Sequence, residues 1–391
     1  MSAAQAISNL TAGACRSGSP RARAAVGVML GFLVHGLVVS TWVSRLPSVK
    51  AQLGLSDGAL GLALLGAAIG SIAGIAAAGV LVTRIGSRRA SQWTVLGFCG
   101  ALILPAFARN GPTLFAALLV YGAMAGANDV SINAQAVGTE RLLGRPFISR
   151  FHAMFSAGGI LGAAAGGWIA GRGVPVPEHL ALGAFLFAIL ALASGRLSID
   201  TPASARPRHG RMVFTRALAA LSAMGFCIFL SEGAMADWTA VYLRQVLHAS
   251  IALAPMGYAV FSAAMTLFRF TGDAITAQIG RVNVVRYGGL VAACGMALAV
   301  AAPAPAWALA GFAAAGAGYS SIIPLAFAAG GRKGPVSEGQ GVATVSGTGY
   351  LGFLVGPPLI GLLAQAASLR AGLAVLVLLA ALAAALAGAV E

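Results

Sequence analysis

SAGGILGAAAGGWIAG, at residues 156–171, and SGTGYLGFLVGPPLIG, at residues 346–361, are two copies of one apolar, glycine-rich stretch. At a constant offset of 190 residues, the second copy repeats six residues of the first, which are Ser156, Gly159, Leu161, Gly162, Gly166 and Gly171. A shorter match, Ile85-Gly86 with Ile279-Gly280, has the similar offset of 194. Small residues let membrane helices approach closely, so we predict that these glycines mainly serve packing. The matches indicate that the two halves of the chain repeat one fold.

The composition of the chain indicates a membrane protein. Hydrophobic residues make up 59% of the 391 residues and charged residues only 9%, whereas about 25% of residues are charged in typical soluble proteins. This excludes a soluble enzyme, a nucleic-acid-binding protein and a disordered chain. We attribute the net charge of +15 to loops that remain in the cytoplasm, where Lys and Arg collect.

Apolar runs long enough to cross a bilayer, about 20 residues each, occur twelve times. We predict helices at 24–45, 57–82, 91–108, 112–139, 150–171, 178–195, 214–243, 253–279, 284–302, 305–330, 338–366 and 370–389. The expected fold is an all-α membrane protein whose twelve transmembrane helices form two parallel six-helix repeats. The expected domains are a cytoplasmic tail (1–23), an N-terminal bundle (24–195), a cytoplasmic linker (196–213) and a C-terminal bundle (214–391).

The distribution of Lys and Arg predicts the orientation of the chain. If the N-terminus is cytoplasmic, 18 of these residues lie in inner segments and 6 in outer segments, and Arg269 lies within a helix. Cytoplasmic loops carry the excess of positive charge. We therefore expect a multi-pass protein of the plasma membrane with both termini in the cytoplasm.

The loop after the second predicted helix reads Gly79-Val-Leu-Val-Thr83-Arg84-Ile-Gly86-Ser-Arg88-Arg89. It resembles the cytoplasmic signature of the major facilitator superfamily, with Thr83 in place of the usual Asp. The second half keeps an acidic residue in Gly272-Asp273, and Arg269, one turn earlier, can pair with it. The resemblance implies a gating role for Arg84, Gly86, Arg88, Arg89, Arg269 and Asp273. Simple anchoring of the loop by positive charge is the alternative.

A second resemblance rests on Asn128-Asp129-Val-Ser-Ile-Asn133-Ala-Gln135, on Phe151-His152 through Gly159, and on Ser231-Glu232 through Trp238. These motifs are similar to those of a branch of uncharacterised bacterial inner-membrane permeases related to the fucose:proton symporters. In the sugar symporters, an acidic residue one turn before an Asn on the fourth helix binds protons and substrate. Asp129 and Asn133 match this spacing. The acidic residue that those symporters carry on the first helix is not evident here, and His35 is the titratable group of that helix.

Charged groups at the centre of a bilayer are costly, so titratable residues there are functional candidates. His35, Asp129 and Glu232 lie near the middle of the first, fourth and seventh predicted helices, respectively, and the resemblance implies that these helices line the central cavity. We predict that the three residues couple transport to protons. Asp237 lies nearer the outer surface, where pairing with an Arg is the alternative to function. The expected substrate-binding residues are Tyr121, Asn128, Asn133, Gln135, Met235, Thr239, Tyr319 and Ser320, whose alternative role is interhelical hydrogen bonding.

No Lys or Arg is expected at mid-depth, which favours a neutral or cationic solute over an anion. The sequence shows no metal-ligand cluster, catalytic triad or nucleotide loop, so we expect no enzyme activity, no metal and no cofactor. The predicted function is secondary active, proton-coupled transport of a small polar, neutral, sugar-like solute by alternating access. Proton-driven efflux of a drug or metabolite and a non-transporting membrane receptor remain as alternatives. The expected partners are the solute, protons and the lipid bilayer, without nucleic acid, and the protein is expected to be a monomer.

Overall fold

The computed structural model of the chain describes residues 20–145, 147–200, 215–333 and 338–391, without the side chains of residues 273, 333, 338–340 and 343. In these ranges all regular structure is helical. The helices are α2 (Pro20–Gln52), α3 (Asp57–Ile85), α4 (Ser87–Ala101), η1 (Leu104–Phe107), α5 (Gly111–Leu143), α6 (Ile148–Gly171), α7 (Val176–Leu197), α8 (Arg216–Gln245), α9 (Met256–Ile279), α10 (Arg281–Ala301), α11 (Pro305–Tyr319), α12 (Ile322–Lys333), α13 (Glu338–Ala366), α14 (Leu369–Ala385) and η2 (Leu386–Val390).

These helices correspond to the twelve predicted spans. Eleven segments of the described chain are long and apolar enough to cross a membrane; α4 with η1 makes one of them, and α11 with α12 makes another. The twelfth is α9, which is 24 residues long and carries Arg269. The first helix begins earlier than predicted, at Pro20. Most of the predicted linker, residues 201–214, and most of the predicted tail, residues 1–19, lie outside the described residues.

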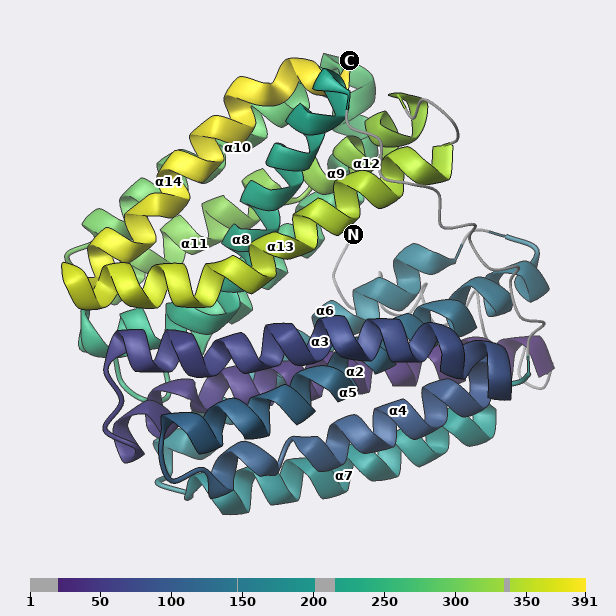
Figure 1. Cartoon of the computed structure of the whole chain (residues 1–391), viewed down its shortest axis with the longest axis horizontal. Coiled ribbons are helices and arrows are strands. Elements are labelled where there is room, and N and C mark those ends of the chain that lie inside the picture. Colours follow the sequence, from purple (N-terminus) through teal and green to yellow (C-terminus); the bar gives the residue numbers. More distant parts are fainter. Residues whose placement is uncertain (1–19, 146, 201–214, 334–337) are drawn as a thin grey trace, which may run out of the picture.

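The helices gather in two groups, α2 to α7 and α8 to η2 (Figure 1). In both groups the first helix packs on the fifth (α2 on α6, α8 on α13) and the second on the fourth (α3 on α5, α9 on α11). This repeated pairing confirms the two six-helix repeats. We call the end of the molecule that carries Pro20 and Glu391 the terminal end, and the opposite end the distal end. Figure 1 shows the two groups apart at the terminal end and together at the distal end.

Glycines allow the pairing between the first and fifth helices. A Cβ on Gly158 would lie 2.3 Å from the carbonyl oxygen of Leu33, and one on Gly352 would lie 2.5 Å from that of Phe226. Real Cβ atoms do not approach backbone atoms so closely, so the helices meet at this distance only because a side chain is absent.

The turn between the second and third helices is also repeated. Gly86 has φ 84° and ψ 157°, and Gly280 has φ 82° and ψ 157°. This region of positive φ is open to glycine and unfavourable for other residues, and it lets α4 and α10 begin directly at the next residue. The predicted loop is therefore a single-residue break: Arg84 lies in the last turn of α3, and Arg88 lies in the first turn of α4.

Candidate functional site

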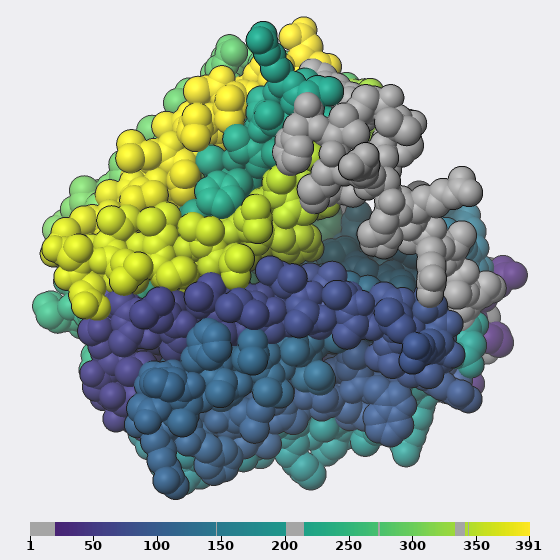
Figure 2. Space-filling view, viewed as in Figure 1, coloured from purple at the N-terminus to yellow at the C-terminus, as the bar shows by residue number. Residues whose placement is uncertain are grey.

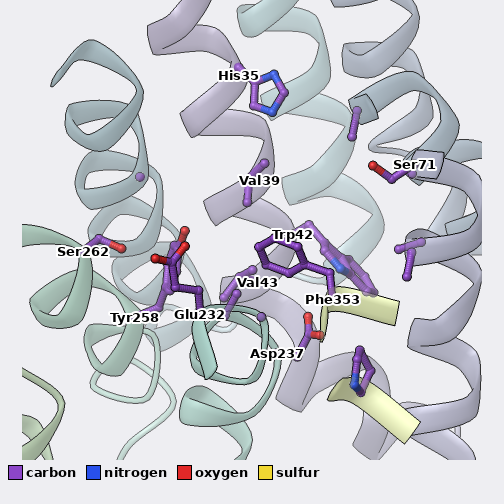
Figure 3. Close-up of a pocket in the computed structure, with 18 of the residues that line it drawn as sticks. His35, Val39, Trp42, Val43, Ser71, Glu232, Asp237, Tyr258, Ser262 and Phe353 are labelled. Carbon is purple, nitrogen blue, oxygen red and sulfur yellow. The ribbon is translucent and has the colours of Figure 1, made fainter. Parts of the chain in front are cut away.

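A cavity of about 400 Å³ lies between the two groups of helices. Its walls come from α2, α3, α5 and α6 of the first group and from α8, α9 and α13 of the second. Polar and aromatic side chains of both groups face each other across it (Figure 3). Clefts of this size hold small molecules in other proteins.

The second group contributes an ion pair to the cavity wall. Arg269 Nη2 of α9 lies 3.6 Å from Glu232 Oε1 of α8, and Arg269 Nε donates to the carbonyl oxygen of Ser320 at 3.2 Å. The expectation of a cavity without a fixed cation is therefore wrong. From its position in the sequence, Arg269 was expected near the inner end of its helix and not at mid-depth. Its side chain nevertheless lines the cavity. Its charge is balanced by Glu232. The predicted pairing with Asp273 involves a side chain outside the described residues.

A second carboxylate, that of Asp237, also lines the cavity. In Figure 3 it is drawn next to Trp42 and Phe353, which line the same cavity. Asp237 and Glu232 point in different directions around α8, yet both line the cavity. Gly233 and Ala236 of the same helix line it as well, so a broad face of α8 borders the cavity. In the described chain, no hydrogen bond or ion pair engages the Asp237 carboxylate.

His35 lies on the first-group wall of the cavity. Asn128 Nδ2 lies 2.8 Å from His35 Nδ1, and Thr94 Oγ1 donates to Asn128 Oδ1 at 3.2 Å. An amide nitrogen only donates, so Nδ1 accepts this bond and the imidazole is neutral with its proton on Nε2. The ring lies between those of Phe98 and Phe155, with centroids 5.0 and 5.5 Å away. Asn128 thus orients His35 from behind the cavity wall.

Three other polar residues of α5 do not line the cavity. Asn133 Nδ2 donates to Asp129 Oδ1 at 3.1 Å, one turn along the same helix. Gln135 is buried, accepts from Ser87 Oγ at 2.6 Å and donates to the carbonyl oxygen of Ile199 at 2.7 Å. Gln135 therefore connects α5 to α4 and to the segment after α7. Tyr121 does line the cavity, and its ring centroid lies 6.2 Å from that of Trp42.

Four predicted substrate-binding residues of the second group are also absent from the cavity lining. Thr239 Oγ1 donates to the carbonyl oxygen of Met235 at 2.6 Å, and both side chains are buried. Tyr319 is buried with its ring 6.4 Å from that of Phe261. Ser320 acts through its carbonyl oxygen, which holds Arg269.

Of the predicted gating residues, those of the first half lie at the terminal end, whereas Arg269 lines the cavity. Arg84 and Arg89 are exposed. Arg88 Nε donates to the carbonyl oxygen of Gly195 at 3.3 Å, and its Nη1 lies 3.7 Å from Asp200 Oδ2. Arg88 thus binds the end of α7 within its own group of helices.

Several cavity residues were missed by the sequence interpretation, and these are Trp42, Ser71, Tyr258, Ser262, Tyr350 and Phe353. Aromatic and hydroxyl side chains are common in apolar helices, so their positions carry no distinctive signal. The described residues contain no group of His, Cys, Asp or Glu that could hold a metal ion.

Comparisons with known proteins agree with this architecture. Residues 28–338 match the sequence profile of the Major Facilitator Superfamily. An uncharacterised MFS-type transporter of Yersinia pestis is 36% identical over 346 residues, which cover 88% of this chain and 90% of that protein. Among solved structures, a mutant of the nucleoside transporter NupG is similar with a TM-score of 0.75 at 14% identity. The match covers 95% of this chain and 99% of the NupG chain. A D-xylose-proton symporter covers 93% of this chain and 96% of its own with a TM-score of 0.72 at 17% identity.

Proposed function

The chain belongs to the major facilitator superfamily, and from this we propose that it moves a small polar solute across the cell membrane by alternating access, in exchange for or together with protons. The protein is a membrane transporter and not an enzyme. The observation that carries the proposal is a cavity between two repeats, with an ion pair and a second carboxylate in its wall.

Alternating access requires that the cavity open to one side at a time. At the distal end, Gln365 Oε1 of α13 accepts from Ser56 Oγ at 2.9 Å and from the backbone nitrogen of Gly58 at 3.1 Å. The terminal end has the two groups apart (Figure 1). Arg84, Arg88 and Arg89 lie at the terminal end, and positive charge favours the cytoplasmic side. The proposed state is therefore inward-facing in a bacterial inner membrane, with both termini cytoplasmic.

Glu232 is the proposed proton site in this geometry. Protonation would remove its negative charge and release Arg269, whose other bond is to the carbonyl oxygen of Ser320. Such a change in the cavity wall would alter the free-energy difference between the inward-facing and outward-facing states. Coupling requires that proton binding shift this equilibrium. Asp129 is the second candidate, from the resemblance to sugar symporters; its nearest described partner is Asn133.

The test compares two substitutions in reconstituted vesicles, with a solute first found by thermal-shift screening of sugars, nucleosides and amines. Glu232→Gln keeps the shape of the side chain and removes its proton chemistry. We expect accumulation driven by a pH gradient to fall about 5- to 150-fold, the usual range of coupling between sites, while exchange without a gradient continues. Glu178→Gln, on an exposed carboxyl of α7, is the control and should accumulate solute normally.

The outcome for Asp129→Asn assigns the proton site. If Asp129→Asn loses accumulation and Glu232→Gln retains it, Asp129 carries the coupling. If both variants concentrate solute as the wild type does, proton coupling through these carboxyls is wrong. Binding of a solute without any exchange would indicate a receptor.

Efflux is the second candidate, because aromatic side chains occupy much of the cavity wall. These are Trp42, Tyr121, Phe155, Tyr258, Phe261, Tyr350 and Phe353. Large aromatic surfaces accommodate varied apolar molecules. Outward pumping of dyes from cells that express the protein, lost in Glu232→Gln, would support efflux.

A further inference from the structure

The carboxylate of Asp237 differs from the other acidic group of the cavity because no basic side chain of the described residues pairs with it. Glu232 lies 3.6 Å from Arg269. Asp237 lines the same cavity, and in the described chain its carboxylate has neither a hydrogen bond nor an ion pair. A charged group enclosed in a membrane protein is costly unless a partner compensates it.

Four basic side chains in the distal half of the protein have partners other than Asp237. Arg45 donates to His179 Nδ1 and to the carbonyl oxygen of Val174, both at 2.7 Å. Arg244 donates to the carbonyl oxygen of Ala249 at 2.8 Å. Lys50 lies 2.5 Å from Asp57, and Arg370 donates to the carbonyl oxygens of Val300 and Ala302. The expected alternative for Asp237, pairing with a nearby Arg, is therefore not what the structure shows.

Aromatic side chains line the same cavity as the Asp237 carboxylate. Trp42 of α2 and Phe353 of α13 lie beside it (Figure 3), and Tyr121 is next to Trp42. A carboxylate beside aromatic faces is a favourable site for an ammonium group, because the anion pairs with the charge and the rings attract cations through their electron-rich faces. In contrast, a neutral hydroxyl would leave the charge of Asp237 uncompensated.

We propose that Asp237, with Trp42 and Phe353, binds an ammonium group of the transported solute, so that the solute is a small polar organic cation. This rests on the proposed transport function and narrows its substrate class from polar solutes to amines. Arg269 does not oppose a cation here, because Glu232 balances its charge. The cavity volume of about 400 Å³ limits the cation to the size of a small metabolite or drug.

The test uses pairs of probes that differ in charge. Choline is compared with its neutral carbon analogue 3,3-dimethylbutan-1-ol, D-glucosamine with D-glucose, and ethanolamine with ethylene glycol, in thermal-shift measurements on the purified full-length protein. We expect a charged member of these pairs to raise the melting temperature, because ligands that bind the folded state stabilise it. Its neutral partner should bind at least tenfold more weakly. Equal stabilisation by both members, or no stabilisation by any cation, overturns the proposal.

Variants test whether Asp237 is responsible. Asp237→Asn should weaken binding of the cation at least tenfold, whereas Glu178→Gln, at an exposed carboxyl of α7, should bind it as the wild type does. Trp42→Leu should weaken binding and Trp42→Phe should restore part of it, which gives a second measure if Asp237→Asn folds poorly. Unchanged affinity in both Asp237→Asn and Trp42→Leu contradicts the proposal.

Counterflow in vesicles separates this inference from the proposed function. If a cation binds through Asp237 but is not exchanged, the ammonium site stands and transport fails. If a neutral solute is exchanged equally well by the wild type and by Asp237→Asn, transport stands and the ammonium site is wrong.

Discussion

The two ends of the interface between the repeats are built differently. At the distal end the helices touch through backbone and small side chains: a Cβ on Gly61 of α3 would lie 2.5 Å from the carbonyl oxygen of Pro357, and one on Gly361 would lie 2.6 Å from that of Asp57. Figure 2 shows α3 and α13 in contact along this seam. At the terminal end, the exposed Arg84 and Arg89 flank the Gly86 turn.

Because the two ends are built differently, different kinds of substitution should disturb the closure of each end. Close contact between glycines depends on shape, so the distal closure is sensitive to added volume. The terminal end carries charged groups that are exposed to solvent, and interactions there are weakened by water and salt. We therefore expect substitutions that enlarge a side chain to disturb closure of the distal end. Substitutions that change a charge should alter closure of the terminal end by a smaller amount.

The largest effect is expected for Gly61→Leu. The new side chain would meet the backbone at Pro357 and Gly361, and overpacking of this kind costs about 1–3 kcal/mol. The distal end should open, so a membrane-impermeant maleimide applied from that side should react faster with a cysteine placed at Val43, in a background without the four native cysteines. Gly79→Leu on the same helix is the control, since a Cβ there meets nothing within 4 Å. Equal labelling of both variants would contradict the role of glycine contact.

A smaller effect is expected for Gln365→Ala. It removes the acceptor for Ser56 Oγ and for the backbone nitrogen of Gly58. A hydrogen bond contributes about 0.5–1.5 kcal/mol, so labelling at Val43 should increase by about tenfold or less. Gln365→Glu keeps an acceptor oxygen and should label more slowly than Gln365→Ala. If the two variants label equally, these hydrogen bonds do not hold the distal end closed.

The smallest effect is expected for Thr83→Asp at the terminal end. Thr83 is exposed and donates to the carbonyl oxygen of Val80 at 2.8 Å. An added carboxylate would face the arginines of the opposite repeat when that end closes, and exposed ion pairs contribute about 0.2–1 kcal/mol. A cysteine at Ile75, in the cavity wall, should become slightly less reactive from the terminal side. Thr83→Asn is the neutral control, and equal reactivity in the two variants would exclude a charged lock.

The repeat and the helices were predictable because they depend on local chemistry. Apolar length predicts where helices cross a bilayer, and the match of Gly86 with Gly280 reflects one backbone conformation that both turns require. His35, Tyr121 and Glu232, which the sequence singled out as candidates, line the cavity, and their roles stay predictions.

The position of Asp129 relative to the cavity could not be predicted from the sequence. Periodicity gives the angle between two residues of one helix, but it does not give the rotation of that helix against its neighbours. Asn128 and Tyr121 share a direction on α5, yet Tyr121 lines the cavity whereas Asn128 binds His35 from behind the wall. Asp129, one residue further, is outside the lining. Asn128 and Tyr121 differ because they lie two turns apart along the helix, and packing of the whole bundle decides which neighbours cover each depth.

The sequence by itself determined the membrane location, the two repeats and the short set of titratable residues, because hydropathy and residue spacing act along the chain. Only the tertiary structure decided the partners of these residues. Arg269 pairs with Glu232, whereas Asp237 has no ion-pair partner among the described residues and lines the cavity with Trp42 and Phe353. The reason is physical: an ion pair requires two side chains within a few ångströms, and that distance depends on how separate helices are packed.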